Sequence, residues 1–152
     1  MTVGGDRGLT LHQSPKVNSS KTSSFTGTSN KTITTFTFSE TVTNLSFTII
    51  DIDSDTNDFH DAVALSSAST YTATEASSTY MNGTGSVANP WRASSATSPV
   101  ADASTTGNVT VTFPSVNSFD LHYSNLATAY ASNYDVYQRI FVGDMKITDD
   151  AC

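Results

Sequence analysis

Charged residues are scarce in this chain, and basic residues are the scarcest. Charged side chains make up 14% of the 152 residues, against roughly 25% in an ordinary soluble domain. Seven lysines and arginines against fourteen acidic residues leave a net charge of −7. Because nucleic acids and anionic membrane surfaces are bound through basic patches, the composition argues against both as partners.

Helix-forming stretches and long apolar runs are also missing. Glutamate occurs only at Glu40 and Glu75, and no segment repeats apolar residues with the 3.6-residue period of an amphipathic helix. No apolar run approaches the roughly 20 residues that span a bilayer, so we expect no membrane insertion. Residues 1–11 lack the plan of a secretory signal peptide, and we expect any export signal or surface anchor to lie outside this chain.

Cysteine occurs once, at Cys152, the last residue. A lone cysteine forms no disulfide within the chain, and a terminal thiol is a poor candidate for a positioned nucleophile. We interpret it as half of a bridge whose partner lies elsewhere, or as the limit of an excised domain.

Hydroxyl side chains take the place of the missing charges. Threonine occurs 25 times and serine 23 times, together about a third of the chain. Threonine fits the pleated surface of a sheet, and apolar residues alternate with hydroxyl residues in several short runs. Turns are expected at Glu40–Thr41 and at Pro114. The apolar positions of these runs predict the core: Phe36, Phe38, Leu45, Phe47, Ile49, Val109, Val111, Phe113, Phe119 and Leu121.

The number and spacing of these runs predict the fold class. About eight short strands separated by turn residues are typical of an all-β, two-sheet antiparallel β-sandwich or jelly roll. We expect a single domain in two parts. Residues 1–30 provide an N-terminal strand around Leu9–Leu11 and a loose polar segment packed on the domain, and residues 31–152 form the sandwich itself.

The run TFTFSETVTNLSFTIIDID, residues 35–53, resembles a motif of bacterial extracellular β-sandwich domains. The motif consists of an aromatic strand, a PVTNLSF-like turn and strand, and an Asp-Ile-Asp corner. Residues 107–123 and 140–145 agree with it. The resemblance covers roughly residues 33–66 and 107–148, about half the chain, and Thr41 replaces the proline of the motif. Such domains are modules of large exported proteins, notably of actinobacteria, mostly of unassigned function. The resemblance implies a sandwich fold in a secreted or cell-surface protein and no particular activity.

Five aspartates and Asn57 lie within residues 51–61, at and after the end of the strand predicted around Leu45–Ile49. Their charges repel one another, and a calcium ion with oxygen ligands would offset the repulsion. An EF-hand is rejected, because Thr56 and Ala62 stand where its loop needs glycine and glutamate. A calcium site of the β-sandwich kind competes with the interpretation that these residues form turns and solvated charges. By alternation Asp51 faces inward, and the partner of its carboxylate could equally be Arg139 or backbone N–H groups. The candidate ligands are Asp51, Asp53, Asp55, Asn57, Asp58, Asp61 and Asp144.

A second candidate site is aromatic. Residues 123–137 consist mainly of Tyr, Ser, Asn and Ala, a composition typical of adaptable binding loops. Trp91 is a candidate stacking platform for a sugar. The alternative is that this tryptophan and some of the tyrosines cover the core. The candidate ligand-binding residues are Trp91, Tyr130, Tyr134 and Tyr137.

Signs of catalysis are weak. Paired aspartates could serve a glycosidase, yet nothing marks an acid in a cleft. His12, His60 and His122 lack metal-ligand spacing. His122 is expected to be exposed on a sheet face, because it alternates with Leu121 and Tyr123. No Gly-x-Ser-x-Gly elbow occurs, so no catalytic residue is assigned.

The sequence therefore favours a noncatalytic extracellular module. The first hypothesis is an adhesive role, with a glycan or a host or neighbouring surface protein as the partner. The second is a structural spacer, or a self-associating subunit of a surface protein or filament. An enzyme acting on glycans is a remote third.

Overall fold

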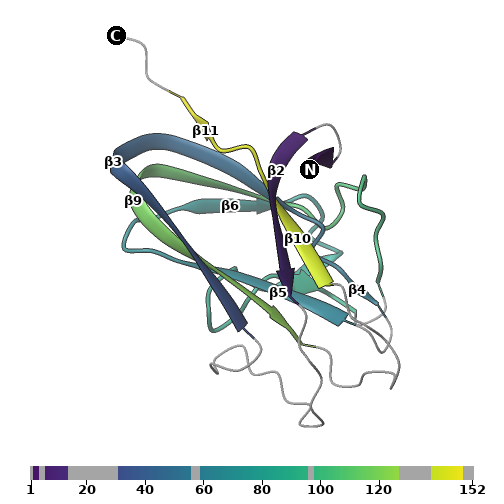
Figure 1. Cartoon of the computed structure of the whole chain (residues 1–152). Helices are drawn as coiled ribbons and strands as arrows, with labels where there is room; N and C mark the ends of the chain where they lie inside the picture. The colour runs from purple at the N-terminus through teal and green to yellow at the C-terminus, as the bar shows by residue number, and fades with distance from the viewer. Residues whose placement is uncertain are drawn as a thin grey trace.

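The computed structural model describes residues 2–3, 6–13, 31–55, 59–95, 98–126 and 138–148. These residues form β-strands and connecting loops without a helix (Figure 1), and they contain no helix that could cross a membrane. The all-β prediction is confirmed. The strands are β1 (Thr2–Val3), β2 (Asp6–Gln13), β3 (Lys31–Ile50), β4 (Ser54–Asp55), β5 (Phe59–Ser66), β6 (Thr72–Glu75), β7 (Met81–Asn82), β8 (Arg92–Ala93), β9 (Val109–Asn125), β10 (Gln138–Gly143) and β11 (Lys146–Ile147).

One antiparallel sheet contains nine of these strands. Its order is β1-β2-β10-β3-β9-β5-β4, with β11 also paired to β3 and β6 to β9, while β7 and β8 pair separately. The strand expected around Leu9–Leu11 lies within β2, which pairs with β10 through Leu11 and Ile140. The polar segment expected after it, residues 14–30, lies outside the described residues.

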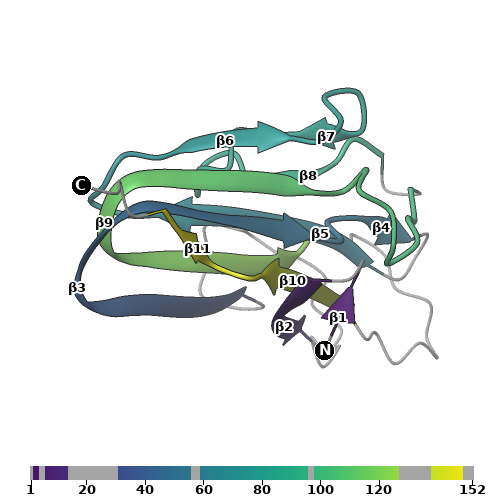
Figure 2. The ribbon, with the colours of Figure 1, turned by 90° about the horizontal axis from the view of Figure 1, so that it is seen from above.

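The sheet makes two layers because β3 and β9 run through both of them and turn back together at one end (Figure 2). Residues 31–37 of β3 pair with the second half of β9, and residues 42–49 pair with its first half. Between these blocks, residues 38–41 of β3 oppose only Asn117. Extra residues of this kind bend a strand pair without breaking it. The two-layered antiparallel arrangement agrees with the predicted sandwich, and the jelly-roll variant stays a prediction.

The turns expected at Glu40–Thr41 and at Pro114 do not separate strands, because both positions lie inside continuous strands. Glu40–Thr41 belongs to the bulged part of β3. Pro114 lies opposite Asn44, whose φ of 50° is in the left-handed region. A proline has no N–H for the ladder, so it is accepted in a strand at a bulge or bend such as this one.

The core lies between the two layers. The aromatic rings of Phe47, Phe113 and Phe119 stack on one another, with centroids 5.2 to 6.4 Å apart. Phe113 and Phe119 lie on opposite halves of β9, so this stack joins the layers. All ten predicted core residues belong to one apolar cluster, eight of them buried and Phe36 and Phe38 half-buried at its border. The core prediction is confirmed.

Hydroxyl groups bond to one another or to carboxylates on the outer faces of the layers. On one face, the Oγ1 atoms of Thr48 and Thr110 lie 3.1 Å apart across β3 and β9. On the other face, the Thr35 hydroxyl donates to Oδ1 of Asp120 at 2.7 Å. Threonine therefore provides a polar surface here without adding charge.

Candidate functional site

The Asp-Ile-Asp corner, residues 51–53, is the short connection between β3 and β4. Asp51 has a φ of 72°, in the left-handed region that aspartate enters more readily than most residues. The N–H of the fully buried Ile52 donates to the Gly107 carbonyl at 3.0 Å. A Cβ at Gly107 would lie 2.6 Å from the Ile52 carbonyl oxygen. The corner therefore packs directly on the backbone at Gly107, where only glycine fits.

Asp61, on β5, is the centre of a buried hydrogen-bond network behind this corner. Its Oδ1 accepts from the Tyr123 hydroxyl at 2.9 Å and from Nε2 of Gln138 at 2.6 Å, and its Oδ2 accepts from the Asp53 N–H at 3.2 Å. The side chain is 0% exposed. Burial raises the pKa of Asp61 well above its ordinary value, although the three donors partly offset this. The network ties β5, β9, β10 and the corner together.

The two carboxyl groups of the corner are also buried. Burial raises the pKa of Asp53 to about 7, although the N–H of Val100 donates to its Oδ2 at 2.9 Å and lowers that pKa. Burial and the nearby Asp102 raise the pKa of Asp51 to about 6, while the charge of Arg139 lowers it. Arg139 pairs directly with Asp102 at 2.5 Å. The carboxyl groups of Asp51, Asp53 and Asp61 thus lie in a buried setting that favours their neutral forms.

The predicted calcium ligands are only partly brought together. Asp51, Asp53 and Asp61 share the buried corner, whereas Asp55 is exposed. Asp144 is exposed and lines a separate hollow of about 170 Å³ on the outer face of β3. Within the described part of the chain, no three carboxylate, histidine or cysteine side chains are arranged to hold a metal ion. The remaining predicted ligands, Asn57 and Asp58, lie outside the described residues.

Calcium binding at the corner therefore stays a prediction, and a melting experiment at pH 8 tests it. An ion that binds only the folded state at a hundred times its Kd adds about 2.7 kcal/mol, so millimolar calcium should raise the melting temperature by several degrees. Asp53→Ala should abolish this rise, and Asp144→Ala should leave it intact. A wild-type melting temperature that responds to neither calcium nor a chelator would show that the aspartates act without an ion.

Trp91 is not a surface platform, so this part of the aromatic-site prediction is wrong. The side chain is 0% exposed, and its Nε1–H donates to Oε1 of Glu75 at 3.1 Å. Its backbone bonds to Val63 of β5 in both directions, and a Cβ at Gly85 would lie 2.1 Å from the indole ring. The indole ring is therefore fully buried in the core. Tyr130, Tyr134 and Tyr137 lie outside the described residues.

His122 is buried, at 6% exposure, and not exposed as expected. Its side chain lies on the outer face of the sheet and that of Leu121 on the inner face, as the alternation indicates. However, its partner on β5 is the buried Ala64, which packs with Val87 and Leu126 over that face. Nε2 of His122 lies 2.8 Å from the Ser66 hydroxyl oxygen, and burial lowers the pKa of this histidine.

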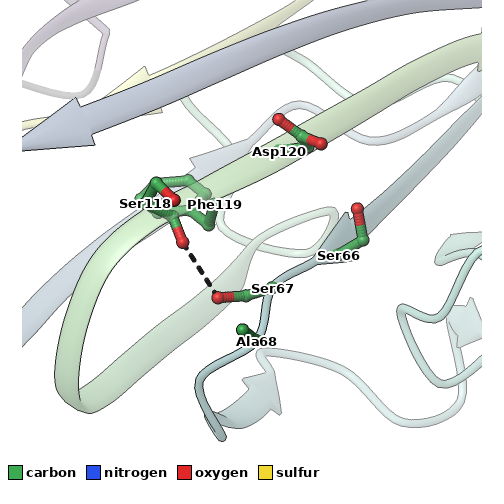
Figure 3. A pocket seen from close by; sticks show the side chains of 6 residues that line it. All are labelled: Ser66, Ser67, Ala68, Ser118, Phe119 and Asp120. Carbon is green, nitrogen blue, oxygen red and sulfur yellow. Dashed lines mark hydrogen bonds between the residues drawn. The ribbon is translucent and has the colours of Figure 1, made fainter.

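An open hollow of about 340 Å³ adjoins this pair on the outer face (Figure 3). It lies where the end of β5 and the chain after it meet β9, and most of its lining groups are polar. Sequence reasoning missed it, because residues more than fifty positions apart line it and only the β5–β9 register brings them together. The lining residues are Ser66, Ser67, Ala68, Ser118, Phe119 and Asp120.

Comparison with family models, curated proteins and solved structures finds no match to this chain.

Proposed function

We propose that this chain is a noncatalytic, secreted or surface-attached module with an adhesive role, whose partner is a glycan or a surface protein of a neighbouring cell or host. The observation that carries the proposal is the polar hollow on a rigid two-layered scaffold. Ser66, Ser118 and Asp120 are held on the neighbouring strands β5 and β9, and sites on strands position polar groups accurately. The scarcity of charge suits recognition by neutral hydrogen bonds rather than by a charged patch.

A catalytic role has less support from the same residues. The Ser66–His122 contact has the distance of a nucleophile and its base. However, Asp120 bonds to Thr35 in the structure and not to this histidine, so it does not complete a triad. The carboxyl groups of Asp53 and Asp61 are hydrogen-bonded in the interior, and neither lines the two hollows found among the described residues. The two acids of a glycosidase, in contrast, flank a cleft.

A glycan array tests the adhesive role. We expect the fluorescently labelled wild-type chain to bind a defined subset of neutral glycans, with no product released from them on prolonged incubation. A parallel screen on immobilised surface proteins covers the protein branch of the proposal. Absence of binding on both surfaces, or cleavage of a bound glycan, would contradict the proposed function.

The alternative, a self-associating structural unit, is favoured by one observation. In the described part of the chain, residues 32–37 of β3 pair on one side only, with β9. Ile33 in this edge is 50% exposed, and an unpaired edge can add a strand of another molecule. Sedimentation at increasing concentration separates the two functions, because only the structural unit needs to form oligomers without a ligand.

A further inference from the structure

The hollow is organised by one row of side chains across three strands. Thr35 of β3 is paired with Asp120 of β9, and Asp120 is paired with Ser66 of β5. Side chains of directly paired residues stand next to each other on the same face of a sheet. Figure 3 shows the Asp120 and Ser66 side chains adjacent at one side of the hollow.

The Asp120 carboxylate in this row is held in place by one hydrogen bond and can accept more. Thr35 donates to its Oδ1 at 2.7 Å, and within the described residues its Oδ2 takes part in no hydrogen bond. The Asp120 side chain is half-exposed at the edge of the hollow. A carboxylate whose orientation is set by a neighbour loses little rotational freedom when a ligand binds. It is therefore prepared to accept hydrogen bonds from a ligand.

The other side of the hollow is built from serines. The Ser67 hydroxyl donates to the Ser118 carbonyl oxygen at 3.0 Å, as the dashed line in Figure 3 marks, and it accepts from the Ser69 N–H at 3.1 Å. Ser66 is held by His122 at 2.8 Å. Phe119 contributes little ring surface, since it is 2% exposed. The hollow therefore offers mainly hydrogen bonds and no broad aromatic surface.

The chemistry of these groups distinguishes between ligand classes. A guanidinium or ammonium group only donates hydrogen bonds, whereas a hydroxyl both donates and accepts, as serine does. Two adjacent hydroxyls of a sugar can donate to the two oxygens of one carboxylate and still accept from a hydroxyl such as that of Ser118. An apolar ligand would find no exposed aromatic surface. The mixed lining thus fits a polyhydroxylated ligand better than a cationic or an apolar one.

We propose that this hollow is a saccharide subsite that binds two adjacent hydroxyl groups of a neutral sugar through Asp120, with Thr35 positioning the carboxylate. This assignment rests on the proposed adhesive function and names the ligand class of the same site. The serines on β9 and on the chain after β5 complete the hydrogen bonds to neighbouring sugar hydroxyls. Arg139 and the corner aspartates take no part.

Saturation-transfer NMR tests the subsite with three probes, the methyl glycosides of mannose, galactose and glucose. At least one should bind the wild-type chain at millimolar concentration. Asp120→Asn should weaken that binding tenfold or more, because it removes the charge and one acceptor from a half-exposed side chain. Thr35→Val should weaken it about threefold. Thr48→Val, which removes a comparable hydroxyl bond on the other outer face, should have no effect.

Several outcomes would overturn the assignment. Equal binding of a glycoside by wild type and Asp120→Asn would place the site elsewhere. Stronger binding of acetyl-arginine amide than of any glycoside would indicate a protein ligand. If no glycoside binds although the chain binds glycans on the array or an immobilised surface protein, the subsite is wrong and the adhesive function stands. If the chain binds neither glycans nor surface proteins, both fail. Unchanged melting temperatures of the variants confirm that the comparison concerns folded protein.

Discussion

Asp61→Ala should lower the free energy of unfolding by about 3–5 kcal/mol, which is a large part of the stability of an ordinary domain. The substitution leaves the Tyr123 hydroxyl, the Gln138 amide and the Asp53 N–H without their shared acceptor in the interior. Each buried donor that loses its partner costs about 1–3 kcal/mol.

Urea denaturation of the purified chain measures this loss, with Asp55→Ala as the matched control. Asp55 is exposed, so its replacement should change stability by less than about 0.5 kcal/mol. If both variants unfold at the same urea concentration as the wild type, Asp61 does not hold β5, β9 and β10 together as the structure indicates.

The corner should also make stability depend on pH in an unusual direction. The pKa values of Asp51 and Asp53, about 6 and about 7, lie above the ordinary 3.8, so between pH 4 and 7 the folded state binds more protons than the unfolded state. Their contribution is fully present below pH 4 and is lost as pH rises through these values. A pKa difference of one unit between the folded and unfolded states corresponds to about 1.4 kcal/mol. Asp53 alone should therefore lower the free energy of unfolding by about 2–4 kcal/mol over this pH range.

Comparison with Asp53→Asn isolates this effect. His60 and His122 act in the opposite direction, because burial lowers their pKa values and their contribution is lost as pH falls. The variant keeps both histidines and one acceptor for the Val100 N–H. In calcium-free buffer, the stability of the wild type relative to Asp53→Asn should therefore decrease from pH 4.5 to pH 8. A constant difference across that range would mean that Asp53 titrates normally.

The core was predictable because a period of two carries over directly into burial. Leu45, Phe47 and Ile49 alternate with hydroxyl residues and all face inward. The continuity of the strands through the bends was not predictable, because a bulge adds residues without changing the polar character of the strand. Glu40–Thr41 and Pro114 look like turns in the sequence for this reason, yet β3 and β9 continue through them.

The candidate sites were less predictable than the core, because they depend on pairing between distant segments. Alternation placed His122 on the correct face, but it does not show that Val87 and Leu126 pack on the β5 residues of that face. Trp91 has no local period, and its burial follows from backbone pairing with Val63. The hollow at Asp120 has no sequence signature, since it arises from the strand register alone.

We propose that the chain binds its partner at the hollow on the outer face of β5 and β9, and that the aspartate corner stabilises the fold. Mapping of backbone amide chemical shifts, with the glycan that binds most strongly on the array, tests this claim directly. We predict that the largest shifts fall on residues 66–68 and 118–120. Shifts confined to residues 51–61, or to residues outside the hollow, would contradict it.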